Sequence, residues 1–434
     1  MKRSSTFARV ATLALVGSLA LAGCGSDSKD DDKDATDKPS TSTSEGSGSE
    51  TPAGAKKGDG KLVIGTLLPQ TGDLAYLGPP EFAGVQLAID EINAAGGIDG
   101  QQVTQVKADS GDGTPDIAGA SVDKLLGQNA DVIVGAAASG VSLSVIDKIV
   151  NAGKVMFSPA NTAAAFDTYD DKGLYFRTSP SDRLQGQVIG NMAVEDGFSN
   201  VAVMARQDAY GEGLAEQVKA TLEEKGANVA EYILYSAEAE NFTAEVNKVA
   251  AAKPDAIVLI GFNETTKIVP QLISKGVGPQ DVQYYFVDGN MADYSDQKFD
   301  LAGVKGTFPA PAEVDKTFND KLLKVDPKIK DFTYGPQAYD AVMLIALAAL
   351  AAGDDDPSAI AAKIVEMSKD GTKCTTWADC SELVKAGEDI DYDGVSGPTD
   401  MNDSGSPNKA TIGIQEYAKG NKYSQIDSVT GILE

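Results

Sequence analysis

From residue 61 onward, short aliphatic runs alternate with longer segments in which apolar residues recur at every third or fourth position. Short apolar runs bounded by turn residues favour buried strands, and a helical repeat of apolar residues favours amphipathic helices. The first part of this pattern predicts strands at 62–67, 103–108, 131–134 and 155–157, with helices at 79–95, 114–126 and 142–150. Strands that alternate with helices in this way form parallel sheets covered on both faces.

The same pattern begins again at residue 201 and predicts a second unit. Its predicted strands are 201–205, 229–235, 256–260 and 282–287, and its predicted helices cover 211–225, 242–252 and a segment that ends at 274. Two successive doubly wound units predict an α/β protein with two lobes. Further on, residues 341–352 form an apolar run. Because a membrane-spanning helix needs about 20 residues, this run predicts a buried helix instead.

The N-terminus has the pattern of an export signal. Lys2, Arg3 and Arg9 are followed by an apolar run at 10–22, which is too short to span a membrane. The run ends in Leu-Ala-Gly-Cys, with the cysteine at position 24. This lipobox pattern predicts that residues 1–23 are a lipoprotein signal peptide and that Cys24 carries the lipid. An ordinary signal peptide with a chance cysteine is the alternative.

Residues 24–60 are predicted to be the lipidated cysteine and a disordered linker, because they are mostly Ser, Asp, Lys, Thr and Gly and offer too little apolar surface to fold. A flexible spacer of this length has a reach of roughly 30–35 Å. The two acyl chains of a lipoprotein cysteine suffice for stable anchoring. The sequence therefore predicts an exported protein that is tethered to the outer face of the cytoplasmic membrane.

The chain is acidic, with a net charge of −27 over 434 residues, which becomes −30 when the three basic residues of the signal peptide are removed. Nothing offers the basic surface that a nucleic-acid partner requires. After Cys24 only Cys374 and Cys380 remain. In an exported protein such a pair favours a disulfide. Two free thiols are the alternative, and zinc is disfavoured because the chain has no histidine.

The absence of histidine also excludes Ser-His-Asp and Cys-His catalysis and the common zinc-hydrolase motifs. Ser121 and Lys124 form an isolated SxxK without its partner motifs, so they are interpreted as helix surface. Hydrolysis by paired carboxylates stays open, although a single tryptophan leaves little to stack on sugars. An enzyme is thus the weaker hypothesis, and neither a cofactor nor a metal is expected.

Ligands of such folds bind beyond the carboxyl ends of the strands. The loops there are 71–76, 136–142, 158–162, 207–211, 262–264 and 288–290. Ser139 precedes a predicted helix, where its hydroxyl and the backbone N–H groups favour a carboxylate. Asp288 ends a strand, where it could pair with an ammonium. Anion donors on one lobe and an acid on the other predict a site for a zwitterion.

Motifs along the folded part carry a resemblance to a known family. They are Gly65-Thr-Leu-Leu-Pro-Gln-Thr-Gly72, Glu81-Phe-Ala-Gly84, Ile89-Asp-Glu-Ile-Asn93 with Gly96-Gly-Ile98, Phe157-Ser-Pro-Ala160, Tyr210-Gly-Glu-Gly213 and Gln337-Ala-Tyr-Asp340. In this order and spacing they resemble the branched-chain amino-acid (Leu/Ile/Val) solute-binding proteins of ABC transporters, over residues 62–432.

The resemblance implies a type I periplasmic-binding fold: two doubly wound parallel-sheet lobes joined by three hinge crossings, which close over the ligand. It places the crossings near 177–182, 307–311 and 397–400. Residues 61–179 plus 310–398 would form one lobe, and residues 180–309 plus 399–434 the other. The implied partners are an amino acid, the ABC permease subunits and the membrane surface, and the protein would be a monomer.

Carried over residue by residue, the family pattern assigns the ligand carboxylate to Ser139, Ala160 and Thr162, and the ammonium to Asp288 and Tyr210. As alternatives, Ser139 and Thr162 cap helices, Tyr210 lies on the surface and Asp288 caps a turn.

The pocket for the ligand side chain departs from the family pattern. Its positions are Tyr76, Leu77, Ala137, Ala138 and Phe262. Small residues at 137 and 138 leave room for extra methylenes, each worth ~0.8 kcal/mol, so the ligand identity stays open between a branched-chain and a larger apolar amino acid.

Three other functions stay open: the same fold binding an amide, urea or aromatic acid, a sensory co-receptor, and a secreted hydrolase. The acidic run at 389–400 partly matches a calcium loop, but Pro398 interrupts it and no helix leads into it. An acid-rich turn is the favoured interpretation there.

Overall fold

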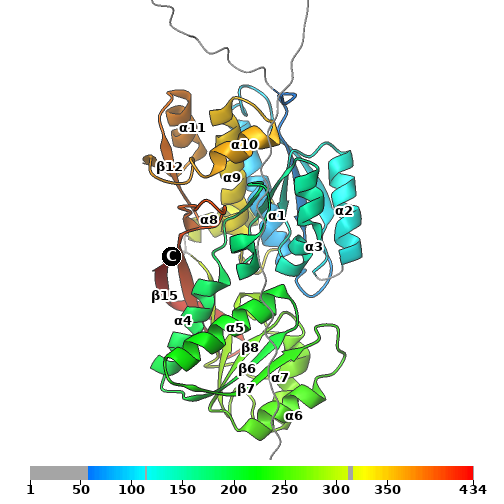
Figure 1. The fold of residues 1–434 in the computed structure, drawn as a ribbon, viewed down its shortest axis with the longest axis vertical. Helices are drawn as coiled ribbons and strands as arrows, with labels where there is room; N and C mark the ends of the chain where they lie inside the picture. Colours follow the sequence, from blue (N-terminus) through cyan, green and yellow to red (C-terminus); the bar gives the residue numbers. More distant parts are fainter. Residues whose placement is uncertain (1–56, 113–114, 311–315, 434) are drawn as a thin grey trace, which may run out of the picture. The chain divides into compact units, whose positions relative to one another are not determined.

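A computed structural model of the chain describes residues 57–112, 115–310 and 316–433. The predicted signal peptide, Cys24 and nearly all of the predicted linker lie outside the described residues. Figure 1 shows the described part as two α/β lobes, here called lobe 1 and lobe 2, each built on its own sheet.

The sheet of lobe 1 consists of five parallel strands in the order β2-β1-β3-β4-β5. These strands are β1 (Val63–Leu68), β2 (Thr104–Asp109), β3 (Val132–Gly135), β4 (Val155–Ser158) and β5 (Tyr175–Arg177). The connections between them are α1 (Gly78–Ala94), α2 (Pro115–Gly127), α3 (Ser139–Asn151) and the short η1 (Ala164–Thr168). The predicted strands and helices of this half are therefore present, with ends that differ by a few residues.

A later stretch of the chain returns to lobe 1. It forms α8 (Lys316–Val325), α9 (Gly335–Ala352), α10 (Pro357–Ile364), α11 (Trp377–Lys385) and a small sheet of β11 (Thr372–Cys374), β12 (Ile390–Gly394) and β13 (Gly397–Pro398). Cys374 and Cys380 form the expected disulfide, with their Cα atoms 5.3 Å apart. Closing so short a loop contributes about 2 kcal/mol in the chain-entropy model.

Helix α9 is the buried helix that the apolar run predicts. Within the described residues it is the one helix long and apolar enough to cross a membrane, but 83% of its apolar window is buried in the protein. It packs along α1. A Cβ atom on Gly84 of α1 would lie only 2.2 Å from the carbonyl oxygen of Gly335. The two helices approach this closely because Gly84 has no side chain, and this contact holds the N-terminus of α9 against lobe 1.

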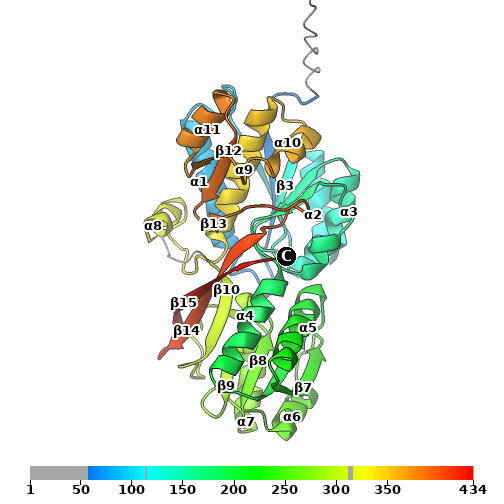
Figure 2. The ribbon, with the colours of Figure 1, turned by 60° about the vertical axis from the view of Figure 1, so that its left-hand side comes forward.

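The sheet of lobe 2 has seven strands in the order β15-β14-β10-β9-β8-β6-β7. They are β6 (Asn200–Arg206), β7 (Asn228–Tyr235), β8 (Ala256–Ile260), β9 (Gln283–Phe286), β10 (Lys305–Pro309), β14 (Lys409–Ala418) and β15 (Lys422–Ile432). The helices are α4 (Asp182–Glu195), α5 (Ala209–Glu224), α6 (Thr243–Ala252), α7 (Thr265–Ser274) and the short η2 (Asp288–Asn290). Figure 2 shows the β14–β15 hairpin beside β10; it pairs antiparallel, so this sheet is mixed rather than purely parallel.

Three passages of the chain connect the lobes. The first follows β5 into α4, and the second follows β10. In the third, the chain remains against lobe 1 as far as Ser406, because Met401 N–H donates to Ser368 and Arg177 donates to Ser406. It enters the sheet of lobe 2 only at β14. The third passage thus lies further along the chain than the resemblance implies.

The first described residues are attached to lobe 1. The N–H groups of Lys57 and Gly58 donate to Asp354, and those of Gly60 and Lys61 donate to Asp355, at 2.8–2.9 Å. Both aspartates directly follow α9. The chain therefore enters the folded part through a fixed contact on lobe 1.

The acid-rich segment at 389–400 forms β12, β13 and the turn between them. Lys373 neutralises two of its carboxylates, at 2.9 Å from Asp391 and 2.7 Å from Asp393. Within the described ranges, which include this whole segment, no group of three or more acidic or cysteine side chains is placed to hold a metal ion.

Candidate functional site

A small cavity of about 20 Å³ lies where the loops of the two lobes meet. Residues of both lobes line it: Leu74, Leu77, Ala137, Ala138, Ser139, Ala160, Thr162, Tyr210, Phe262, Asp288, Gly289 and Tyr334. Nine of these were predicted as ligand-binding residues from the sequence. A cavity needs about 10–15 Å³ to hold one water molecule, so in this closed arrangement there is room for little more than one water, and an amino acid requires the lobes to move apart.

Lobe 1 contributes the beginning of α3 to the cavity. Ser139 is the first residue of this helix and does not precede it, because the helix begins three residues earlier than predicted. The first N–H groups of a helix have no partner within the helix and favour a negative charge. The Ser139 hydroxyl accepts a hydrogen bond from Ala163 N–H at 3.3 Å, which connects α3 to the neighbouring loop. This end of the cavity therefore carries partial positive charge.

The loop after β4 is held in place by buried polar contacts. The Ser158 hydroxyl accepts from the N–H groups of Ala160 and Asn161 and donates to Ala136 O at 2.7 Å. The Asn161 amide donates to the carbonyls of Ala136 and Ala137. These bonds fix the loop that carries Thr162. The Thr162 hydroxyl oxygen is buried and has no hydrogen-bond partner, so it is available to a ligand in the cavity.

Asp288, the first residue of η2 and two residues after β9 in lobe 2, takes part in most of the polar contacts at the cavity. Its Oδ1 atom accepts from the Tyr210 hydroxyl at 2.6 Å and from the Gln185 amide at 2.7 Å. Its Oδ2 atom accepts from the Tyr334 hydroxyl at 2.7 Å. Burial raises the pKa of Asp288, while these donors act in the opposite direction. No basic side chain is bonded to this carboxylate within the described residues, so a cationic ligand group would be its counter-charge.

Two tyrosines of lobe 1 reach across to lobe 2. Besides the bond from Tyr334 to Asp288, the Tyr76 hydroxyl lies 3.2 Å from Gly289 O and 3.4 Å from Asp288 O. Tyr76 does not line the cavity itself, although it was predicted as a side-chain contact. Both hydroxyls donate to a three-residue segment of lobe 2, so these bonds join the lobes directly at the site.

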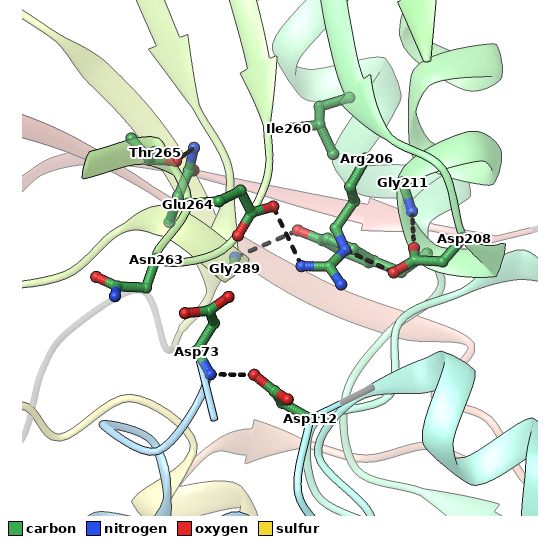
Figure 3. A network of polar contacts seen from close by, with 12 residues as sticks. Asp73, Asp112, Arg206, Asp208, Gly211, Ile260, Asn263, Glu264, Thr265 and Gly289 are labelled. Atoms are coloured by element: carbon green, nitrogen blue, oxygen red, sulfur yellow. Dashed lines mark hydrogen bonds and ion pairs between the residues drawn. The ribbon is translucent and has the colours of Figure 1, made fainter. Parts of the chain in front are cut away.

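An aromatic wall on lobe 2 continues into a charged network. Phe262 stacks on Tyr210 with ring centroids 5.4 Å apart, and the Arg206 guanidinium lies 3.5 Å from the Phe262 centroid. Arg206 also pairs with Asp208 at 2.5 Å and with Glu264 at 3.2 Å (Figure 3). Cation–π contact and two ion pairs hold the guanidinium and thereby the orientation of Phe262.

Acidic residues of lobe 1 face this network. Figure 3 shows Asp73 and Asp112 opposite Arg206 and Glu264, with the Asp73 N–H donating to the Asp112 carboxylate. Burial raises the pKa of Asp112, and the positive charge of Arg206 acts against that shift. Arg206 therefore interacts electrostatically with both lobes beside the cavity.

Three cavity residues were not predicted from the sequence: Leu74, Gly289 and Tyr334. Tyr334 lies far along the chain from the other site residues, in a left-handed backbone conformation (φ 63°) just before α9. The sequence offered one signal for Tyr334: it directly precedes Gly335-Pro336 and the long apolar helix that follows. Asn263, adjacent to Phe262, is exposed and does not line the cavity.

Comparisons with known proteins agree with this architecture. The periplasmic binding protein family matches residues 61–421. Leu/Ile/Val-binding protein homolog 2 of Brucella abortus is 30% identical over 319 residues, covering 70% of this chain and 82% of the relative. The isoleucine complex of the branched-chain amino acid transporter substrate binding protein LivJ from Streptococcus pneumoniae has a TM-score of 0.70 at 24% identity and covers 86% of this chain and 100% of its own.

A solute-binding protein of an ABC transporter from R. palustris, in complex with benzoate, has the same fold, with a TM-score of 0.68 at 18% identity over 86% of this chain and 97% of its own. The family match covers well over half of the present chain. The chain belongs to the periplasmic binding protein family, as a branched-chain amino-acid type of solute-binding protein with the type I fold.

Proposed function

We propose that this protein captures one amino acid between its lobes and delivers it to an ABC importer, while Cys24 anchors it to the outer face of the cytoplasmic membrane. The observation that carries the proposal is the polarity of the cavity. A helix N-terminus and the unpartnered Thr162 hydroxyl lie on lobe 1, and the buried Asp288 carboxylate lies on lobe 2. An α-amino acid has the complementary charges.

The walls between these two ends favour an apolar side chain. Leu74, Leu77, Ala137, Ala138 and Phe262 contribute hydrocarbon surface to the cavity. Leucine, isoleucine, valine and phenylalanine are therefore the proposed ligand class. An aromatic acid is less compatible, because it has no ammonium to neutralise Asp288. The protein itself performs no chemistry in this proposal, and ATP is hydrolysed by separate subunits.

Lobe closure is the proposed signal to the permease. A ligand held by Thr162 and Asp288 stabilises the closed arrangement, because these residues belong to different lobes. The hydrogen bonds from Tyr76 and Tyr334 to lobe 2 would form in the same movement. The sensory co-receptor stays the second candidate, because the chain is also 25% identical over 357 residues to the chemotactic signal transduction system substrate-binding protein BasB of Halobacterium salinarum. The secreted hydrolase has no comparable support.

Calorimetry on residues 25–434, unfolded and refolded to remove carried-over ligand, tests the proposal. We expect saturable one-to-one binding of leucine, isoleucine, valine or phenylalanine. Benzoate, urea and short amides serve as the comparison set. Heat from one of these compounds, together with no signal from any amino acid, would contradict the proposed ligand class while leaving the fold unaffected.

A further inference from the structure

A second buried carboxyl group lies directly behind Asp288. Asp182, the first residue of α4, is 0% exposed, and its N–H donates to Thr162 O at 2.7 Å. The side-chain amide of Gln185 donates to Asp288 Oδ1 at 2.7 Å and to Asp182 Oδ1 at 3.3 Å. The amide nitrogen of Gln185 thus bridges the two carboxyl groups. The distance between Asp182 Oδ1 and Asp288 Oδ1 cannot exceed the sum of these two hydrogen-bond lengths.

Unpartnered acceptor atoms surround this bridge. Asp182 Oδ2, Gln185 Oε1 and the Thr162 hydroxyl oxygen are all buried without a hydrogen-bond partner. A buried polar atom without a partner destabilises the folded state, because it has lost its hydrogen bonds to water. Two of these three atoms are acceptors only, and an ionised Asp182 would be the most costly of them. The neighbouring Thr162 hydroxyl acts to lower the pKa of Asp182 by hydrogen bonding, but its one proton cannot serve both the Asp182 and the Gln185 acceptor. The cluster therefore still needs a further proton or an N–H donor.

Among the described residues, no free cation compensates this pair. Besides Asp288, the charged groups that act on Asp182 are Arg177 on β5 and Asp167 on η1. The Arg177 guanidinium already pairs with Asp167 at 2.5 Å and donates to the carbonyls of Asn161 and Ala163. The other titratable groups facing the pair are the hydroxyls of Tyr210 and Tyr334. Burial and repulsion by Asp288 raise the pKa of Asp182, and burial raises the pKa of Asp288.

We propose that Asp182 and Asp288 share one proton in the ligand-free protein, and that the ammonium group of an amino acid displaces this proton when it binds. The inference rests on the proposed function and extends it. The proton passes to water, so the pair changes from one negative charge to two while the ligand adds one positive charge. Two adjacent buried carboxyls generally hold one proton between them in this way.

Proton release makes ligand capture depend on pH. Where the free pair holds its proton, affinity rises by about tenfold per pH unit, because one proton leaves for each ligand bound. In the Asp182→Asn variant the two side chains can no longer share a proton. We therefore expect that the ligand affinity of this variant does not rise with pH. A group outside the cavity provides the matched control: Asp171 is also a buried acid, and burial raises its pKa.

The test is calorimetry with leucine, isoleucine, valine and phenylalanine on residues 25–434, at one neutral pH in buffers of different ionisation enthalpy. We expect release of about one proton per ligand from the wild type and Asp171→Asn, and almost none from Asp182→Asn. Binding without proton release by the wild type would overturn the inference alone. Absence of binding by every amino acid would instead contradict the proposed function.

A second measurement needs no ligand. Carbon-13 NMR of the carboxyl groups in the ligand-free wild type is expected to show an aspartic acid that remains protonated far above the usual range of aspartate. This signal should be absent from Asp182→Asn and present in Asp171→Asn. Equal spectra for the wild type and Asp182→Asn would contradict the shared proton, whichever ligand the protein binds.

Discussion

Asp288→Asn is expected to lower the affinity for an amino acid by roughly 30-fold or more, because removal of one partner of a buried, hydrogen-bonded charge pair costs about 2–5 kcal/mol. Asparagine keeps the size of the side chain but removes the charge that faces the ammonium. It also places an amide NH₂ near the hydroxyls of Tyr210 and Tyr334, which donate to the Asp288 carboxylate in the wild type. Calorimetry with the amino acid that the wild type binds best measures the loss.

Asp296→Asn is the matched control for this variant. Asp296 follows the same strand of lobe 2 but is exposed, so its loss changes the net charge equally without touching the cavity. We expect the control to bind within a few-fold of the wild type. If Asp288→Asn binds as tightly as the control, the ligand has no ammonium at this position. Amides and acids would then replace amino acids as the proposed ligand class.

Arg177→Met is expected to destabilise the folded protein by about 3–5 kcal/mol, because it removes one partner of a buried ion pair. Arg177 is 0% exposed. Its Nε donates to Ser406 at 2.8 Å, and its terminal nitrogens reach Asp167 and the carbonyls of Asn161 and Ala163. Urea unfolding measures the change in free energy. Affinity should fall as well, since the loop that carries Thr162 loses its support.

Arg183→Met controls for the loss of a positive charge near the same passage. Arg183 lies in the first turn of α4 and is exposed. Its replacement should change the free energy of unfolding by less than about 0.5 kcal/mol. If Arg177→Met were equally mild, Arg177 would not be what holds β5, the site loop and the 401–406 segment together.

Most of the site could be predicted because the topology of a parallel sheet fixes where its loops converge. The strands ending near Gly135, Ser158, Arg206 and Phe286 were visible as aliphatic runs, and their carboxyl ends meet at one edge of each sheet. The residues following these runs therefore had to be neighbours. Asp288 and Thr162 were found in this way together with the family motifs.

The parts that were missed depend on tertiary contacts that no local pattern records. The predicted helix began at Ser142, but the Ser142 hydroxyl accepts from Ala136 N–H at 3.1 Å, and α3 begins at Ser139 after an N-cap residue, Ala138, that makes no side-chain cap. Tyr334 directly precedes α9, and it lies at the cavity because α9 packs on α1. From this position its hydroxyl contacts Asp288 of lobe 2. The β14–β15 hairpin likewise depends on pairing with β10 across a large sequence separation.

The only tryptophan of the chain has a consequence for optical assays. Trp377 opens α11, beside the disulfide at Cys380, and packs into the lobe 1 core that also contains α9. In Figures 1 and 2, α11 lies at the end of lobe 1 away from lobe 2. Indole emission will therefore report unfolding of that end and remain nearly constant during ligand titration. Ligand binding would instead be measured from the absorbance of the buried tyrosines at the cavity. The fluorescence of a Phe262→Trp variant is the second option.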